Sequence, residues 1–169
     1  QIDNAGLALM ALQATRPYTA DGVANAQWPG RVQHLDNGAL ADAWPHRQIW
    51  LDGAHNAHGA HALANSLRGI HDGKWNIICG ALNTRDPVEF LAPIAALAGR
   101  VACLTIPDQD ASLSAAEMRD AAKAQGLNAS AATTLATAFD ILDPSLPVII
   151  CGSLYLAGHV LLQNKTLPD

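Results

Sequence analysis

The chain has 169 residues, half of them apolar, which is enough for one compact domain with a real core and too few for two. Its net charge of -5, without a basic stripe, argues against nucleic acid as a partner. No run of about 18 apolar residues occurs and the N-terminus shows no signal pattern, so we expect a soluble, cytoplasmic protein. Cys79, Cys103 and Cys151 lie far apart without a C-x-x-C pair, which predicts buried thiols in a reducing compartment.

The first part of the chain is predicted to be a helix followed by a linker. Residues 2–13 carry apolar side chains at helical spacing, and a Trp-Pro-Gly-Arg segment at residues 28–31 then interrupts the pattern before an alternating stretch at 32–35. A helix that ends in a linker before a complete domain is typical of the end of a preceding domain. We therefore expect residues 1–27 to be such a tail with its linker, residues 28–169 to form a separate domain, and the natural protein to be longer.

From residue 31 onward, short apolar runs alternate with longer segments of helical periodicity. The predicted strands are 48–51, 76–79, 101–106, 129–132 and 148–151, and the predicted helices are 57–67, 88–98, 114–124, 135–142 and 154–162. Residues 49–51 and 148–150 are apolar at consecutive positions, which is typical of a strand that is covered on both faces. The alternation predicts an α/β, Rossmann-like fold with a mainly parallel sheet and helices on both faces.

Polar residues follow three of these strands, at residues 52–56, 80–86 and 152–153. In an open α/β sheet, ligands bind at the carboxyl ends of the strands, so we expect the three segments to lie along one edge. Taken singly, the residues have structural explanations. Asp52 can cap a turn, and Asn56 and Ser153 are favoured helix N-caps.

His55 can be a loop histidine without a role, and Arg85 can be a solvated cation, although a cation at a helix N-terminus opposes the helix dipole. The order and spacing of the polar residues, rather than any one of them, indicate a function.

Four motifs occur in a set order: WPGR at 28–31, LDGAHNAHG at 51–59, RDP at 85–87 and CGSLYLAGHVL at 151–161. Together they resemble the C-terminal domain of folylpolyglutamate synthase and dihydrofolate synthase, within the Mur ligase superfamily. The opening residues 1–12 resemble the last helix of that family's central domain, so the resemblance covers essentially the whole chain. His58 and His159 depart from the residues that many relatives carry there, and neither is assigned to the site.

The resemblance implies an ATP-dependent acid–amino-acid ligase that adds L-glutamate to folate or dihydropteroate through an acyl phosphate. In that family the central domain carries the phosphate loop and the Mg²⁺ ligands, and the C-terminal domain closes over the nucleotide and helps to bind glutamate. Residues 1–27 would then end the central ATPase domain, and 28–169 would form the glutamate-ligase domain. A G-x-x-x-x-G-K-[ST] loop occurs nowhere in the sequence, so we expect the chain alone to be inactive.

The same resemblance implies roles for six residues. Those carried over to ATP are Arg31, Asp52 and Asn56, and those carried over to glutamate are His55, Arg85 and Ser153. His55 and Asp52 are the candidate catalytic residues, and no metal ligand is expected. The implied cofactors are ATP and Mg²⁺, and the implied partners are ATP, L-glutamate, folate or dihydropteroate and the preceding P-loop domain, without nucleic acid or membrane.

Other functions compete with the ligase. Asp52, His55, His58 and His61 recur at every third residue, which raises the possibility of a zinc hydrolase. A step of three residues on a helix turns the side chain by about 60° each time, however, and H-E-x-x-H is absent. A serine hydrolase using Ser153 lacks the G-x-S-x-G elbow. A nucleotide-binding or interaction module without catalysis stays open, although the absence of G-x-G-x-x-G disfavours a dinucleotide.

Overall fold

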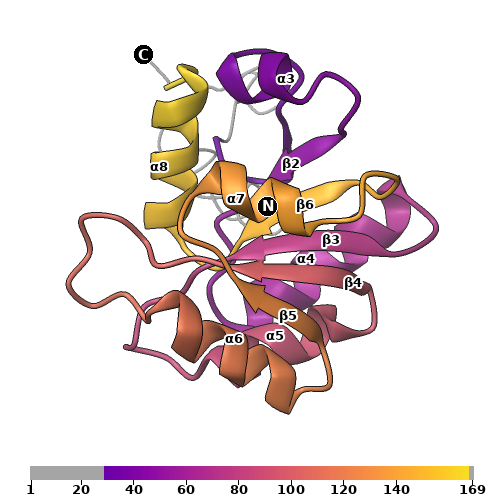
Figure 1. Ribbon diagram of the computed structural model, residues 1–169. Coiled ribbons are helices and arrows are strands. Elements are labelled where there is room, and N and C mark those ends of the chain that lie inside the picture. The colour runs from indigo at the N-terminus through magenta and orange to yellow at the C-terminus, as the bar shows by residue number, and fades with distance from the viewer. Residues whose placement is uncertain (1–28, 168–169) are drawn as a thin grey trace, which may run out of the picture.

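The computed structural model describes residues 29–167, so the helix predicted at 2–13 and the boundary after residue 27 lie outside it. Its centre is a six-stranded sheet in the order β1-β2-β6-β3-β4-β5 (Figure 1). The strands are β1 (Gln33–His34), β2 (Ile49–Leu51), β3 (Trp75–Cys79), β4 (Ala98–Cys103), β5 (Asn128–Ala131) and β6 (Val148–Cys151). The short edge strand β1 is antiparallel to β2, and the other neighbouring pairs are parallel.

Helices cover both faces of the sheet, as the strand–helix alternation predicts (Figure 1). The helices are α3 (Ala39–Ala43), α4 (Ala57–Ile70), α5 (Pro87–Ala95), α6 (Ala115–Ala124), α7 (Leu135–Ile141) and α8 (Leu154–Asn164). Side chains of α4, α5 and α6 pack in the core on one face, and side chains of α3, α7 and α8 pack on the other. Between residues 29 and 167, no helix is long and apolar enough to cross a bilayer.

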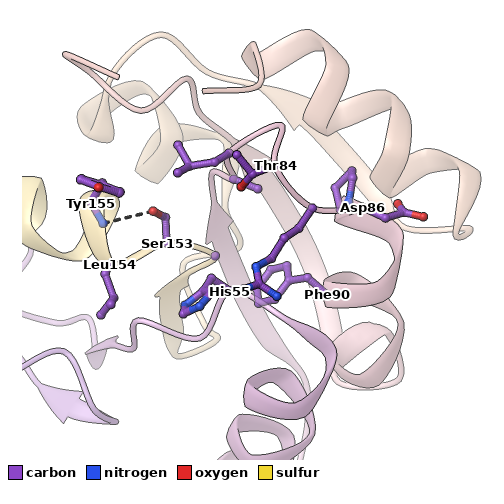
Figure 2. Close-up of a pocket in the computed structure, with 12 residues that line it drawn as sticks. His55, Thr84, Asp86, Phe90, Ser153, Leu154 and Tyr155 are labelled. Carbon is purple, nitrogen blue, oxygen red and sulfur yellow. Dashed lines mark hydrogen bonds between the residues drawn. The ribbon is translucent and has the colours of Figure 1, made fainter. Parts of the chain in front are cut away.

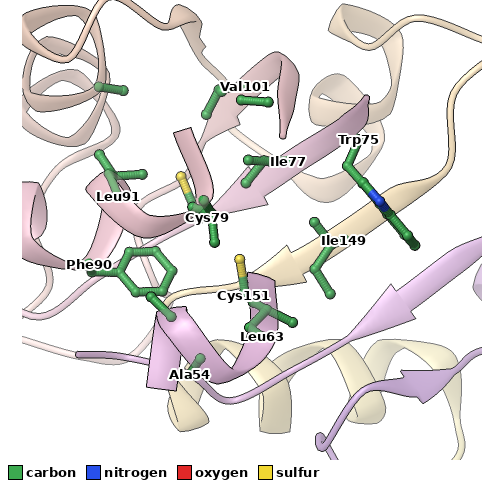
Figure 3. Close-up of a cluster of buried hydrophobic side chains, with 14 of the residues drawn as sticks. Ala54, Leu63, Trp75, Ile77, Cys79, Phe90, Leu91, Val101, Ile149 and Cys151 are labelled. Atoms are coloured by element: carbon green, nitrogen blue, oxygen red, sulfur yellow. The ribbon is translucent and has the colours of Figure 1, made fainter. Parts of the chain in front are cut away.

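Alternate residues of the central strands enter the two cores. On β6, Ile149 and Cys151 face the core under α4 and α5, whereas Val148 and Ile150 face the opposite core. Figure 3 shows the first of these cores around Trp75 and the neighbouring strands. Because both faces are covered, strands of this kind are apolar at consecutive positions, and burying each such side chain contributes roughly 1.5–3 kcal/mol.

The structure differs from the sequence-based prediction at one helix–strand boundary. The helix predicted at 88–98 ends at Ala95, and the strand predicted at 101–106 instead runs from Ala98 to Cys103, so this boundary was predicted wrongly. The carbonyl of Leu97 accepts a hydrogen bond from the Trp75 amide at 2.8 Å, and Trp75 lies opposite Ala98 in the parallel pair. Pairing with β3 therefore places Ala98 in a strand, although the apolar spacing of the sequence there continues the preceding helix.

Helix α3 is absent from the sequence-based prediction. Gly38 stands at its N-cap without a side-chain hydrogen bond, and the helix has only five residues. The Leu40 amide is satisfied instead by the buried side chain of Asn164, at 2.8 Å from Oδ1, near the end of α8. A short helix with this support depends on a residue far along the chain, which local periodicity does not show.

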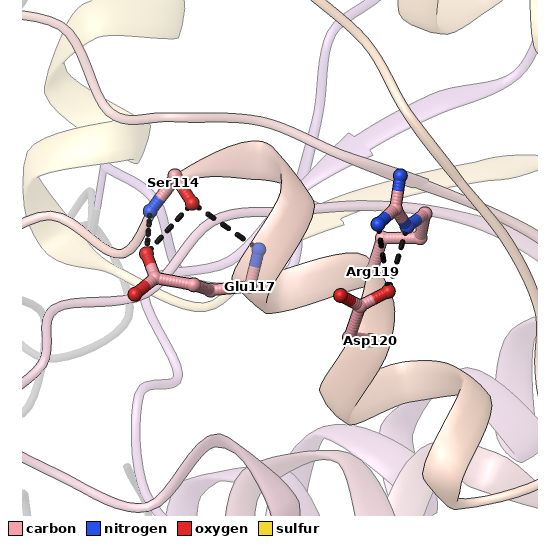
Figure 4. Close-up of polar contacts among 4 residues, drawn as sticks. All are labelled: Ser114, Glu117, Arg119 and Asp120. Carbon is pink, nitrogen blue, oxygen red and sulfur yellow. Dashed lines mark hydrogen bonds and ion pairs between the residues drawn. The ribbon is translucent and has the colours of Figure 1, made fainter.

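Helix starts follow the expected capping chemistry. Asn56, Asp86 and Ser153 are the N-caps of α4, α5 and α8, and each side chain accepts a backbone hydrogen bond. Figure 4 shows the reciprocal capping box at the start of α6, where Ser114 and Glu117 bond to each other's backbone amides. The hydroxyl and amide of Ser114 lower the pKa of the Glu117 carboxyl.

Asn76 is a fully buried polar residue in the otherwise apolar strand β3. Its Nδ2 donates to the carbonyls of Asp143 and Leu146 at 2.7 and 3.2 Å, and its Oδ1 accepts from the Asp143 amide at 3.2 Å. These bonds hold the loop between α7 and β6 against the sheet.

Replacing Asn76 by leucine should therefore destabilise the fold by about 2–4 kcal/mol, because the partly buried loop groups lose the partner that satisfies them. Urea unfolding monitored by circular dichroism measures this difference. The matched control is Asn128→Leu on the exposed start of β5, which should change stability by no more than about 0.5 kcal/mol. Equal unfolding midpoints for the two variants would contradict the role given to Asn76.

Candidate functional site

The three polar segments meet at the carboxyl edge of the sheet, as predicted. Strands β2, β6 and β3 are neighbours, so the loops that follow them lie side by side. The Gly152 amide donates to the Ala54 carbonyl at 2.9 Å, and the Gly80 amide donates to the Cys151 carbonyl at 3.4 Å. The loop after β6 is thus fixed between the other two.

Gly152 permits this close approach. Its φ of 110° lies in a region that side-chain-bearing residues rarely adopt, and a Cβ at this position would lie 2.5 Å from the carbonyl oxygen of Gly80. The glycine therefore allows the loops after β6 and β3 to pack backbone against backbone.

A cavity of about 230 Å³ opens between these loops (Figure 2). Its lining comes from the three strand-end loops and from the first turns of α5 and α8. The lining residues are His55, Ala81, Leu82, Thr84, Arg85, Asp86, Pro87, Phe90, Gly152, Ser153, Leu154 and Tyr155. The cavity thus brings together the three residues that were predicted to lie near glutamate, His55, Arg85 and Ser153.

The ring of His55 is held in one orientation. It is half-buried, and its Nδ1 lies 2.9 Å from the Gly53 carbonyl oxygen. Since a carbonyl can only accept, Nδ1 carries the proton in this contact, and in the neutral ring Nε2 keeps a lone pair. The imidazole can therefore accept a proton or a hydrogen bond through its second nitrogen.

Two helix N-termini face the cavity. Ser153 is buried, and its Oγ accepts from the Tyr155 amide at 3.1 Å in the first turn of α8 (Figure 2). Asp86 caps α5 through the Val88 amide at 2.8 Å, directly after the exposed Arg85. Helix N-termini carry partial positive charge, which Asp86 offsets at α5, so the N-terminus of α8 and the guanidinium of Arg85 are the groups that favour an anionic ligand.

The residues predicted to contact ATP do not line this cavity. Asp52 is buried, with 5% of the residue exposed, and its Oδ1 and Oδ2 accept from the amides of Ala54 and Val32 at 2.7 and 2.9 Å. Burial raises the pKa of the Asp52 carboxyl, whereas these two donors and the nearby Arg31 oppose the rise. Asn56 Oδ1 caps α4 through the Gly59 amide at 2.8 Å. Both side chains thus have the structural roles that their residue types favour, and their contact with ATP stays a prediction.

Zinc ligation was the second enzymatic hypothesis from the sequence. Asp52 points into its own turn, while His58 and His61 are exposed on α4. Among residues 29–167, no three His, Cys, Asp or Glu side chains lie close enough to share a metal ion.

The sequence-based prediction missed the apolar walls of the cavity. Phe90 is buried in α5, and Leu154 and Tyr155 are 51% and 56% exposed in the first turn of α8. Aromatic and aliphatic residues in helices ordinarily belong to a core, so their residue types carry no functional signal. Their position in the first helical turn after a polar strand-end loop is the signal that points to them.

The fold and the strand-end site define a glutamate ligase domain. The family described as "Mur ligase, glutamate ligase domain" matches residues 30–154, and the chain belongs to that family.

Relatives with known names are longer. The folylpolyglutamate synthase of Lacticaseibacillus casei is 28% identical over 159 residues, which cover 89% of this chain and 36% of that protein. A probable dihydrofolate synthetase of Schizosaccharomyces pombe is 25% identical over 156 residues, which cover 85% of this chain and 36% of that one. The chain therefore spans little more than a third of the length of these relatives.

Solved structures share the same fold. The bifunctional folylpolyglutamate synthase/dihydrofolate synthase of Yersinia pestis, in complex with AMPPNP and Mn ion, has a TM-score of 0.78 and 25% identity. The match covers 96% of this chain and 38% of that one. A structure of a bifunctional folylpolyglutamate synthase/dihydrofolate synthase with Mn, AMPPNP and L-glutamate bound has a TM-score of 0.77 and 25% identity, and covers 95% of this chain and 39% of that one.

Proposed function

We propose that the chain is the C-terminal domain of an ATP-dependent ligase that adds L-glutamate to folate or dihydropteroate through an acyl phosphate. The observation that carries the proposal is the joint placement of His55, Arg85 and Ser153 around one cavity at the carboxyl edge of the sheet. Membership of the glutamate ligase family supports it, as do the relatives named folylpolyglutamate synthase and dihydrofolate synthetase.

The cavity suits a small dicarboxylic amino acid. Its volume of about 230 Å³ lies below the range of roughly 300–1,000 Å³ that is usual for drug-sized ligands. A guanidinium pairs with a carboxylate through two parallel hydrogen bonds, so Arg85 is the proposed partner of one glutamate carboxylate. The hydroxyl of Ser153 can donate a hydrogen bond to the ligand while its oxygen accepts the bond that caps α8.

His55 is the proposed catalytic residue on the glutamate side. The amine of glutamate must be unprotonated when it attacks an acyl phosphate, and the free Nε2 of His55 is suited to accept a proton or to orient the amine. Phe90 and Leu154 offer apolar surface to the methylene groups between the charged ends.

We assign the nucleotide to the neighbourhood of Arg31, which is exposed, lies close to Asp52 and does not line the cavity. The guanidinium of Arg31 is suited to a phosphate oxygen, and Asn56 lies on the same loop as Asp52. We propose that a preceding P-loop domain supplies the phosphate loop and the Mg²⁺ ligands. The free, buried thiols of Cys79, Cys103 and Cys151 favour a reducing compartment, and we propose the cytoplasm.

The proposal is tested with the full-length protein and with the present 169-residue chain, each given ATP, Mg²⁺, L-glutamate and either folate or dihydropteroate. The full-length protein should release ADP and form a product heavier by one glutamyl residue, which mass spectrometry detects. The present chain should form no product, because it lacks the phosphate loop. L-aspartate, one methylene shorter, serves as the control for the amino acid. ATP binding without ADP release in the full-length protein would favour the nucleotide-binding module, and ligation by the present chain would refute the need for a second domain.

A further inference from the structure

Three cysteines form a row across the middle of the sheet. Cys151, Cys79 and Cys103 are the last residues of β6, β3 and β4, and the parallel register pairs Cys79 with each of the other two. All three are free thiols, and all three enter the core under α4, α5 and α6. The ligase chemistry proposed above uses none of them.

Within the row, Cys79 and Cys103 are the close pair. Their Sγ atoms lie 4.0 Å apart, at the limit of a thiol hydrogen bond, and no such contact with Cys151 occurs among residues 29–167. Neighbouring strands are about 4.8 Å apart, which lies inside the range of about 4.4–6.8 Å between the Cα atoms of a disulfide. The backbone therefore already holds Cys79 and Cys103 at a separation from which their sulfurs can bond.

The contact makes the two thiols unequal. With Cys79 as the donor, the hydrogen bond lowers the pKa of Cys103 and raises the pKa of Cys79. Burial, with the charge of Asp52, raises the pKa of Cys151 and keeps that thiol protonated. Since the thiolate is the reactive form of cysteine, Cys103 is the nucleophile of the row and Cys79 is its nearest partner.

The pair lies directly behind the cavity. Ala81 and Phe90 line the cavity and belong to the same core as the thiols, and Figure 3 shows Phe90 and Cys79 in this core. Cys79 and Cys103 are fully buried, so a small reagent reaches them when the strand ends open locally.

We infer that Cys79 and Cys103 are a modification site, at which a hydroperoxide converts the two thiols to a disulfide between β3 and β4. The sulfur of Cys103 attacks a peroxide oxygen, the O–O bond breaks, and the released hydroxide takes up the thiol proton and leaves as water. The sulfur of Cys79 then displaces the hydroxyl group from the Cys103 sulfur, and this group leaves as water with the Cys79 proton. Two thiols are thus oxidised, and one hydrogen peroxide is reduced to two waters.

The disulfide should loosen the loops around the cavity. A disulfide holds its Cβ atoms about 3.8 Å apart, which is less than the strand spacing, so Cys79 is drawn toward β4 and away from β6. On the β6 side, the Gly80 amide bonds to the Cys151 carbonyl at 3.4 Å, which is already long. We expect this bond to break first, and with it the close backbone contact between Gly80 and Gly152.

Peptide mapping of the full-length protein tests the site, whatever reaction the protein catalyses. Trypsin places the three cysteines on separate peptides, 75–85, 101–119 and 124–165. After treatment with hydrogen peroxide and alkylation in denaturant, peptide 75–85 should be linked to 101–119 while 124–165 is alkylated, and dithiothreitol should release the linked pair. A link through Cys151, three alkylated peptides, or sulfinic or sulfonic acid on Cys103 without a link would overturn the inference.

Two variants serve as matched controls for the mapping. Cys151→Ala removes the third thiol of the row and should leave the link between 75–85 and 101–119 unchanged. Cys103→Ala should abolish the link, and Cys79 should then be alkylated. Loss of the link in a folded Cys151→Ala variant, or its persistence in Cys103→Ala, would contradict the assignment, and the wild-type map decides the site even where a variant does not fold.

Amide hydrogen exchange and kinetics test the effect on the cavity. Exchange in residues 80–86 and 152–155 should be faster in the oxidised wild type and unchanged in peroxide-treated Cys103→Ala. The KM for glutamate should rise by on the order of tenfold, an expectation that rests on the proposed function. A disulfide that leaves exchange unchanged would refute the loosening of the loops. Faster exchange with an unchanged KM would instead count against glutamate as the ligand of this cavity, with the modification site intact.

Discussion

Replacing Arg85 by alanine in the full-length enzyme is expected to raise the KM for L-glutamate by about 30-fold or more while leaving the KM for ATP nearly unchanged. Loss of one partner from a buried, hydrogen-bonded charge pair costs about 2–5 kcal/mol. Arg85 is exposed in this domain, so solvent screening favours the lower end, and about 2 kcal/mol corresponds to roughly 30-fold. Steady-state kinetics with each substrate varied in turn measure both constants.

Two further variants sharpen the Arg85 test. Arg85→Lys keeps the charge but loses the planar, bidentate geometry, so its KM for glutamate should lie between those of the wild type and the alanine variant. Arg68→Ala removes an exposed arginine from the last turn of α4 and should change neither constant. If Arg85→Ala had a normal KM for glutamate and a raised KM for ATP, Arg85 would belong to the nucleotide site and not to the glutamate site.

Gly152→Ala is expected to destabilise the fold by about 2–6 kcal/mol. A residue with a side chain at φ 110° adds about 1–3 kcal/mol of backbone strain, and its Cβ would lie 2.5 Å from the Gly80 carbonyl oxygen. Neither backbone can move without opening the strand-end loops, and such overpacking costs a further 1–3 kcal/mol, roughly. Urea unfolding measures the loss, and glutamate binding should weaken in the same variant because Gly152 lines the cavity.

Variants at two other glycines distinguish backbone strain from the close Cβ contact as causes of the Gly152→Ala destabilisation. Gly126 also has a positive φ, 75°, but a Cβ there would meet open space, so Gly126→Ala should show the backbone strain alone. Gly158 lies inside α8 with open space around it, and Gly158→Ala should stabilise by about 0.5–1 kcal/mol. A Gly152→Ala loss no larger than that of Gly126→Ala would contradict the close approach to Gly80.

The sequence predicts the centre of the sheet because β2 and β6 are apolar at consecutive positions and helical periodicity follows the strands. It does not predict where helix gives way to strand near Ala98, since pairing with Trp75 decides that boundary, nor α3, which depends on Asn164. Elements that depend on distant partners leave no local periodicity.

In the site, too, the order of residues along the chain predicts some features, whereas others depend on contacts with distant residues. The order of polar strand-end residues is enough to predict that Arg85 and Ser153 lie near each other, because parallel strands share an edge. The side-chain direction of Asp52 is not predictable in this way, since the amide that it bonds belongs to Val32, 20 residues earlier.

The last strand that the structure describes, β6, lies between β2 and β3 in the middle of the sheet. No native pairing joins β2 to β3 directly, so β1–β2 and β3–β4–β5 stay two separate parts of the sheet until residues 148–151 have been synthesised. Each piece would expose an unpaired apolar edge, which is prone to aggregation, and the non-local pairing that removes it is intrinsically slow. A premature stop codon before residue 148 would therefore remove a central strand and divide the sheet in two, whereas loss of an edge strand would only shorten it. Gly152 and Ser153 follow this same strand, so the cavity that they line is completed only when β6 has joined the sheet.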